Sequence, residues 1–250
     1  MPKGIGFITL APLRSEPADT SELVSQLVYG ESFDVLEKRK NWSRIALDDY
    51  DYEAWIDNKQ YRELSEEQFE KLQKHPPLIA QDLLSYVSLP DASIQMAILG
   101  SNLAACSVLG HRHEANATSF EQPDKSKIIE HALLLLNAPY LWGGKSPLGI
   151  DCSGFTQLVY ASAGMKIPRD AYQQAQKGEI LSFIEEAEAG DLAFFDNSEG
   201  KITHVGIILK QNYIIHAHGC VRIDRIDQSG IYNPIRNQHT HQLRIIKKLI

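Results

Sequence analysis

The sequence predicts an α+β chain: one or two small all-β barrels come first, and a domain of helices and an antiparallel sheet follows. In the first part, strand-length apolar runs recur at roughly ten-residue spacing between turn signals. In the second part, apolar residues at helical spacing precede three strand-length runs joined by short loops. The charge divides at the same place. Through Asp124 the chain has 11 basic and 20 acidic side chains, whereas the remainder has 14 and 12.

Composition excludes several classes of protein. The net charge of -7 argues against a protein that binds nucleic acid by bulk positive charge. No stretch approaches the roughly 20 apolar residues of a membrane span, and the first residues lack the pattern of a secretory signal. The three cysteines, Cys106, Cys152 and Cys220, cannot all pair. We therefore expect a reduced, cytoplasmic chain with neither a nucleic-acid partner nor a membrane partner.

Residues 1–75 are predicted to form a small barrel and a connector. The expected strands are Ile5–Leu10, Leu23–Val28, Phe33–Leu36, Ser43–Leu47 and Ala54–Ile56. The order of several landmarks resembles a bacterial SH3-like barrel: Arg14, Pro17, Gly30, Val35, Leu36, Trp42, Trp55 and Ile56. The alternative is that the two tryptophans are core aromatics of some other β domain.

Residues 76–123 are predicted to form a second, reduced SH3-like barrel. Its apolar runs are Ser85–Leu89, Ile94–Leu99 and Ala104–Leu109. His111 and His113 have the spacing of a metal-binding pair, but no third ligand lies near them in the sequence. We therefore interpret them as solvated loop histidines. A polar linker around Pro123 then leads to the third unit, residues 124–250.

Cys152 has the features of a reactive cysteine. A loop rich in Gly and Pro begins at Pro139, and a helix is expected to start at or near Cys152. The free amides and the dipole at a helix N-terminus stabilise a thiolate, so we expect Cys152 to be reactive at neutral pH. Cys106 and Cys220 are interpreted as small buried hydrophobic residues.

Two histidines downstream are candidates to act with Cys152. Residues 190–195, 202–209 and 213–217 read as three strands of an antiparallel meander. His204 and His216 then lie on adjacent strands at comparable offsets and can share a face. In that arrangement His204 faces Cys152, and His216 fixes the tautomer of His204.

Six segments of this last unit, PYLWGG, DCSGF, PRDAYQQ, GDLAFF, HVGIIL and IIHA, resemble the NlpC family of papain-like cell-wall cysteine peptidases. The resemblance covers residues from about 125 to 250. It implies that Cys152 is the nucleophile, that His204 is the general base and acid, and that His216 orients His204. It also implies a set of substrate-binding residues, without any metal or cofactor: Asp151 and Ser153 at the substrate's free amino terminus, and Tyr140, Trp142, Arg169 and Asp170 along the cleft.

With the barrel in front, the whole chain resembles the γ-D-glutamyl-L-diamino-acid endopeptidases. These enzymes cut murein peptides after a free L-Ala-γ-D-Glu unit, which implies a murein-derived peptide as substrate and a role in peptide recycling. In such relatives the barrel supplies an acidic residue and a tyrosine that close the non-prime side. The candidates here are Glu53, Tyr52 and Tyr86. Ala171 stands where a small hydroxyl residue is common, and Lys and diaminopimelate both fit as the residue after D-Glu.

Four alternatives stay open at this point. The first is a hydrolase of intact murein, and the second is a non-catalytic wall-binding protein. The third is a zinc hydrolase using His204, His216 and His218, or the pair His239 and His241. The sequence lacks the H-E-x-x-H helix or Cys-x-x-Cys pair that a zinc site typically uses. The last is a related thiol fold that performs acyl transfer on lipids, although the segments PYLWGG and DCSGF fit the peptidases better.

Overall fold

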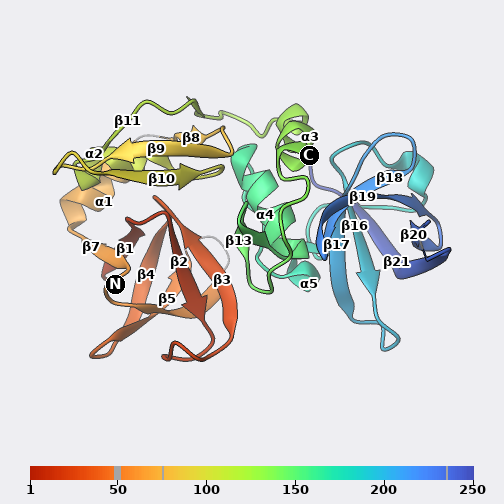
Figure 1. Ribbon diagram of the computed structural model, residues 1–250, viewed down its shortest axis with the longest axis horizontal. Coiled ribbons are helices and arrows are strands. Elements are labelled where there is room, and N and C mark those ends of the chain that lie inside the picture. The colour runs from red at the N-terminus through yellow and green to blue at the C-terminus, as the bar shows by residue number, and fades with distance from the viewer. Residues whose placement is uncertain (48–51, 75, 235) are drawn as a thin grey trace.

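The computed structural model describes residues 1–47, 52–74, 76–234 and 236–250. Figure 1 shows two β-rich units on one side, a group of helices in the middle and a second large sheet on the other side. This arrangement confirms the predicted α+β class. The boundary placed at residue 75 lies outside the described residues.

The first unit is a seven-stranded antiparallel sheet with strand order β3-β2-β6-β5-β4-β1-β7. Its strands are β1 (Lys3–Gly6), β2 (Leu10–Arg14), β3 (Leu23–Val28), β4 (Ser32–Lys38), β5 (Trp42–Leu47), β6 (Tyr52–Asp57) and β7 (Tyr61–Leu64). The prediction of a single strand over Ile5–Leu10 was wrong, because β1 ends at Gly6 and β2 begins at Leu10. The chain turns there because Gly6 exchanges backbone hydrogen bonds with Glu31 and Gly30, which ends β1 before β2 begins.

A helix and two small sheets form the second unit. Its elements are α1 (Glu66–Gln73), β8 (Ile79–Ala80), β9 (Leu84–Ser88), β10 (Ile94–Ile98), η1 (Leu103–Ala105), α2 (Cys106–Leu109), β11 (Arg112–His113) and β12 (Ala117–Thr118). The sheets have the orders β10-β9-β11 and β12-β8. The apolar run Ala104–Leu109 is helical rather than extended, because the Asn102 side chain caps its start and Gly110 ends it in the left-handed region.

The structure corrects the expectation of a solvated histidine pair in this unit. His111 is buried, and its Nδ1 lies 3.0 Å from the Tyr29 hydroxyl of the first barrel. The two rings also stack, with centroids 5.9 Å apart. The Nδ1 contact and the stacked rings of His111 therefore join the first two units.

The third unit begins with helices and ends with the large sheet. Its helical and hairpin elements are α3 (Lys125–Leu134), β13 (Lys145–Ser146), β14 (Gly149–Ile150), α4 (Cys152–Ser162), α5 (Ala171–Gln174) and η2 (Ile184–Glu186). Its sheet strands are β15 (Glu179–Leu181), β16 (Leu192–Asp196), β17 (Ile202–Ile208), β18 (Tyr213–His218), β19 (Cys220–Asp227), β20 (Gly230–Asn233) and β21 (Gln238–Lys248). The predicted antiparallel meander is confirmed as β16-β17-β18. Strands β19–β21 extend this sheet beyond what the sequence predicted.

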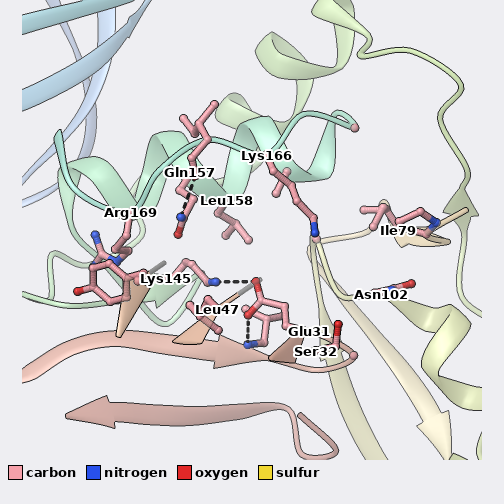
Figure 2. Close-up of a pocket in the computed structure, with 18 of the residues that line it drawn as sticks. Glu31, Ser32, Leu47, Ile79, Asn102, Lys145, Gln157, Leu158, Lys166 and Arg169 are labelled. Atoms are coloured by element: carbon pink, nitrogen blue, oxygen red, sulfur yellow. Dashed lines mark hydrogen bonds and ion pairs between the residues drawn. The ribbon is translucent and has the colours of Figure 1, made fainter. Parts of the chain in front are cut away.

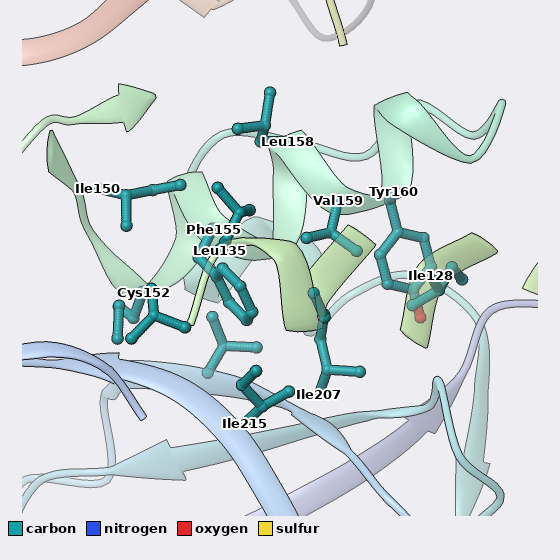
Figure 3. Packing of buried hydrophobic residues seen from close by; sticks show 14 of the residues in the cluster. Ile128, Leu135, Ile150, Cys152, Phe155, Leu158, Val159, Tyr160, Ile207 and Ile215 are labelled. Atoms are coloured by element: carbon teal, nitrogen blue, oxygen red, sulfur yellow. The ribbon is translucent and has the colours of Figure 1, made fainter. Parts of the chain in front are cut away.

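The core of the third unit fixes α4 against the sheet. Figure 3 shows Phe155 and Val159 of α4 near Ile207 of β17 and Ile215 of β18. These four side chains are fully buried. Cys152 borders the same cluster at the start of the helix. Burial of this apolar face therefore sets the position of the first turn of α4 relative to the strands that carry the candidate histidines.

Polar contacts join the first barrel to the third unit. Lys145 Nζ donates to Glu31 Oε1 at 2.7 Å, and the Lys145 backbone N–H donates to the Gln26 side chain at 2.7 Å. A cavity of about 170 Å³ lies where the three units meet, and Figure 2 shows the Lys145–Glu31 pair at its wall. Cys152 is not among its lining residues, whereas Tyr52 and Arg169 are. Within the described residues, no helix has the length and apolar character needed to span a bilayer.

Candidate active site

Cys152 is the first residue of α4, as the sequence predicted. The preceding residue, Asp151, caps the helix by accepting a hydrogen bond from the Gly154 N–H at 2.7 Å. A Cβ at Gly154 would lie 2.2 Å from the carbonyl oxygen of Gly144, so only glycine lets the helix start this close to the loop. Cap and glycine together set the Cys152 backbone in place.

The Asp151 carboxylate is engaged inside the protein on both oxygens. Arg169 binds it through two hydrogen bonds, of 3.0 Å and 2.6 Å, and the Gly143 N–H donates to it at 2.9 Å. Arg169 also donates to Ser153 Oγ at 2.9 Å and to Ser25 Oγ of β3 at 3.0 Å. Asp151 and Ser153, which were expected at the substrate's amino terminus, therefore both accept hydrogen bonds from Arg169. Because their acceptors already serve the buried Arg169, they are part of a fixed support between barrel and helix.

Three consecutive strands carry a chain of hydrogen-bonded side chains beside Cys152. His204 Nε2 on β17 lies 2.8 Å from His216 Nδ1 on β18. His216 Nε2 lies 3.0 Å from Asp224 Oδ2 on β19, and all three side chains are buried. The Val205 backbone N–H, next to His204, hydrogen-bonds to Cys152. Since Nε2 of His204 is occupied, its Nδ1 is the ring nitrogen left for exchange with the thiol.

Asp224 was missed in the sequence analysis. Nothing there placed a strand after Ala217, so no residue of β19 was considered as a partner of His216. The sequence signal that could have identified Asp224 is an Asp in the segment directly after the predicted strand that carries His216. Arg222 Nε also lies 2.6 Å from Asp224 Oδ2, and Arg222 Nη2 donates to Asp224 Oδ1 at 2.8 Å.

The electrostatics of this group follow from burial. Burial, together with the nearby Asp151 charge, raises the pKa of the Cys152 thiol to about 11. Burial, followed by the neighbouring His216, holds the pKa of His204 well below its usual value. Both shifts favour the uncharged thiol and imidazole, against the free thiolate expected from the helix start alone. Hydrogen bonds from His216 and Arg222 outweigh burial at Asp224 and lower its pKa to about 2.

The histidines of the zinc alternative are arranged differently from what a metal site requires. His241 stacks on His204 with ring centroids 4.2 Å apart, and His218 lies 4.9 Å from His241. His239 instead contacts Asp227 at 2.9 Å on the surface. Across the part of the chain that the structure describes, no three His, Cys, Asp or Glu side chains form a metal-ligand set.

On the other side of Cys152, the barrel and the loop before α4 supply a group of polar side chains. The Trp142 indole N–H donates to Glu22 Oε1 at 2.6 Å. Tyr52 is largely buried, and burial followed by the nearby Asp170 raises its pKa. Burial also raises the pKa of Asp170, the cap residue of α5. The pKa of Tyr140 rises to about 12, through burial and then the adjacent Cys152.

Two of the residues proposed to close this side lie elsewhere. Glu53 pairs with Arg44 at 3.1 Å, and half of its side chain is exposed. Tyr86 is 61% exposed on β9 of the second unit. Of the three barrel candidates, only Tyr52 is placed beside the Asp151–Arg169 support and Asp170. Glu22, in the loop before β3, provides the acidic side chain there and was not among the expected residues.

The family comparisons divide the chain in the same way as its fold. The NlpC/P60 family matches residues 137–244, and the bacterial dipeptidyl-peptidase Sh3 domain matches residues 13–60. A γ-D-glutamyl-L-lysine dipeptidyl-peptidase of Bacillus cereus is 26% identical over 237 residues, which cover 80% of this chain and 68% of that protein. Dipeptidyl-peptidase 6 of Lysinibacillus sphaericus is 27% identical over 83% of this chain and 84% of that protein.

A similar protein from Bacillus subtilis, also named γ-D-glutamyl-L-lysine dipeptidyl-peptidase, is 39% identical over 42% of this chain and 36% of its own length. Among solved structures, an NlpC/P60 family protein from Bacillus cereus superposes with a TM-score of 0.80. That likeness covers 98% of this chain and 99% of the other at 18% identity, so it concerns the fold. The chain therefore carries an NlpC/P60 cysteine-peptidase domain behind a bacterial SH3 domain.

Proposed function

We propose that this protein hydrolyses the bond between γ-D-Glu and the following diamino acid in murein peptides that begin with a free L-Ala. The observation that carries the proposal is the pair of acidic side chains, Glu22 and Asp170, which both lie near Tyr52. Glu22 is exposed and Asp170 is partly buried, and a partly buried carboxylate such as that of Asp170 suits a substrate ammonium. The names of the relatives from both Bacillus species support the same substrate class.

In the proposed reaction Cys152 Sγ attacks the carbonyl carbon of the D-Glu side chain. The thiol proton passes to Nδ1 of His204 as the C–S bond forms, because the pKa of the buried thiol is too high for it to ionise alone. The negative charge on the carbonyl oxygen meets the free N–H groups at the start of α4. His204 then gives the proton to the leaving amine nitrogen, the C–N bond breaks, and a thioester remains.

Water completes the cycle by the same route in reverse. His204 takes a proton from the water as its oxygen attacks the thioester carbon. The C–S bond breaks, and the proton returns to Sγ. His216 orients the His204 ring throughout, and the Asp224 carboxylate stabilises the positive charge that develops along this chain.

The amino end of the substrate is proposed to meet Glu22, Tyr52 and Asp170. Burial makes the Asp170 carboxylate costly as an isolated charge, so a bound ammonium offsets that cost. An N-acetylated or glycan-linked peptide would bring a bulky neutral group to the same place. We infer that the enzyme acts on released peptides, which fits a recycling role in the cytoplasm.

The experiment compares L-Ala-γ-D-Glu-L-Lys, its N-acetylated form and intact sacculi, with products identified by mass spectrometry. Losing one charge-assisted contact typically costs about 1.5–3 kcal/mol, and an unpaired buried charge costs more. We therefore expect kcat/KM to favour the free peptide by at least about a hundredfold. Efficient cleavage of sacculi would support the intact-murein alternative, whereas no cleavage of any of the three would leave the wall-binding alternative.

A further inference from the structure

The paired histidines of β21, His239 and His241, have different surroundings. A β-bulge separates them, because Ile231 pairs with His241 and the next residue, Tyr232, pairs with His239. The extra residue, Thr240, breaks the usual two-residue alternation of side chains. As a result His239 stays at the surface with Asp227, while His241 reaches the histidines beside Cys152.

The His241 ring lies flat on His204. The two ring centroids are 4.2 Å apart and the planes differ by 24°. Phe195 of β16 flanks both rings, with centroids 5.8 Å from His204 and 5.9 Å from His241. Thr240 Oγ1 lies 2.9 Å from His241 Nδ1 and holds that ring in its plane. His204 is therefore covered on one face by aromatic side chains that are themselves fixed.

We propose that His241 is a positioning residue that acts through His204. It holds the His204 ring in the plane needed for proton transfer to and from Cys152, and it keeps water from that face of the ring. A proton-transfer partner held in line spares the reaction the cost of orienting it, and small misplacements cost large factors in rate. This inference rests on the proposed role of His204.

The charge state of His241 suits such a role. The titratable groups that influence it are His216 and His218 of β18 and Asp224 of β19, and it also faces His204 of β17. Burial, then the two β18 histidines, lower the pKa of His241 to about 4, although Asp224 acts in the opposite direction. The ring is therefore neutral near pH 7 and places no positive charge against the His204 imidazolium that forms during the reaction.

The first test measures kcat and KM on L-Ala-γ-D-Glu-L-Lys for His241→Ala, His241→Gln and His241→Phe, with His239→Ala as the matched control. Without a ring at position 241, we expect kcat to fall by about ten- to a hundredfold while KM changes little. Phe restores the flat cover, so His241→Phe should recover most of the loss. His239→Ala should match the wild type.

The second measurement needs no substrate and follows the His204 ring by NMR titration, with His204→Ala to assign its signal. Water admitted by His241→Ala reduces the burial of His204, so its pKa should rise toward the ordinary value of about 6.5. His241→Phe keeps the site dry and should leave that pKa close to the wild-type value.

Equal effects of the Ala and Phe variants, or of the position 239 and 241 variants, would overturn the inference. Thermal unfolding of each variant identifies any that fail to fold, and His241→Gln then stands in for His241→Ala. If the wild-type protein does not cleave the tripeptide, the proposed function fails. The NMR titration would still decide whether His241 controls His204.

Discussion

On one side of Cys152, His204, His216 and Asp224 come from three consecutive strands of one sheet. On the other side, Glu22 and Tyr52 come from the barrel, and Asp170 comes from the start of α5. The first group is joined by direct hydrogen bonds within about 20 residues of chain. The second group meets only because the barrel packs against the third unit. The proton-transfer group thus comes from one domain. The second group, here called the barrel-side group (Glu22, Tyr52 and Asp170), needs two domains.

This difference separates the two proposed tasks. The group of His204, His216 and Asp224 is buried, and hydrogen bonds link its side chains one to the next, as a rigid proton-transfer chain requires. The barrel-side group depends on longer-range contacts such as Arg169 to Ser25 and Trp142 to Glu22. Changes on the first side should therefore reduce turnover of every substrate, whereas changes on the second side should alter which peptides are accepted.

The largest expected effect comes from the side of the sheet. Cys152→Ala and His204→Ala should each lower kcat by about 10⁴-fold on the free tripeptide. The nucleophile and its base act together, so removing either one removes nearly all of their joint contribution. Combining the two changes should add little further loss. Steady-state kinetics with mass-spectrometric product detection measures this.

Cys220→Ala and His218→Ala are the matched controls for that prediction. Cys220 is only half-buried, and His218 lies at the exposed end of β18. Both variants should keep most of the activity. A loss at Cys220 as large as that at Cys152 would contradict the assignment of the nucleophile.

The second prediction concerns the barrel-side group. Glu22→Gln and Asp170→Asn each remove one negative charge, while Gln can still accept from Trp142 and Asn can still cap α5. We expect kcat/KM for the free tripeptide to fall by about ten- to a hundredfold, and the preference over the N-acetylated form to shrink by a similar factor. The measurement is the ratio of kcat/KM values for the two peptides.

Glu53→Gln is the control for the substitutions in the barrel-side group, because Glu53 pairs with Arg44 on the barrel surface. It should leave both kcat/KM and the peptide preference unchanged. If Glu53→Gln alters the preference for the free peptide as much as Glu22→Gln does, the role of the barrel-side group has been given to the wrong residues.

The same contrast explains how much the sequence could predict. Local patterns were enough for the helix start at Cys152 and for His204 and His216 on neighbouring strands, since these depend on spacing within one domain. Asp224 was missed because β19 was not recognised as a strand. Glu22 and the occupied state of Asp151 depend on how the barrel packs, and no local pattern specifies that contact. Burial, which opposes the Cys152 thiolate, is likewise a property of the assembled fold.

The smallest expected effect comes from Asp224→Asn, at the far end of the proton-transfer chain. The amide oxygen of Asn still accepts from His216, so orientation is kept and only the charge is lost. Arg222 already balances part of that charge, and its side chain is 29% exposed, so it can turn to water. We expect kcat to fall by about tenfold with little change in KM, a loss far below that at His204.

The same substitution has a signature in stability that depends on pH. The pKa of Asp224 is lowered in the folded protein from 3.8 to about 2, so its carboxylate stabilises the fold at pH values above about 4. That contribution, on the order of 2 kcal/mol, is lost as pH falls through the folded-state value. Urea unfolding should therefore show Asp224→Asn less stable than the wild type at pH 7, with the two converging as pH approaches 2. A stability difference that persists unchanged at pH 2 would mean that the carboxylate charge is not what Asp224 contributes to this side of the site.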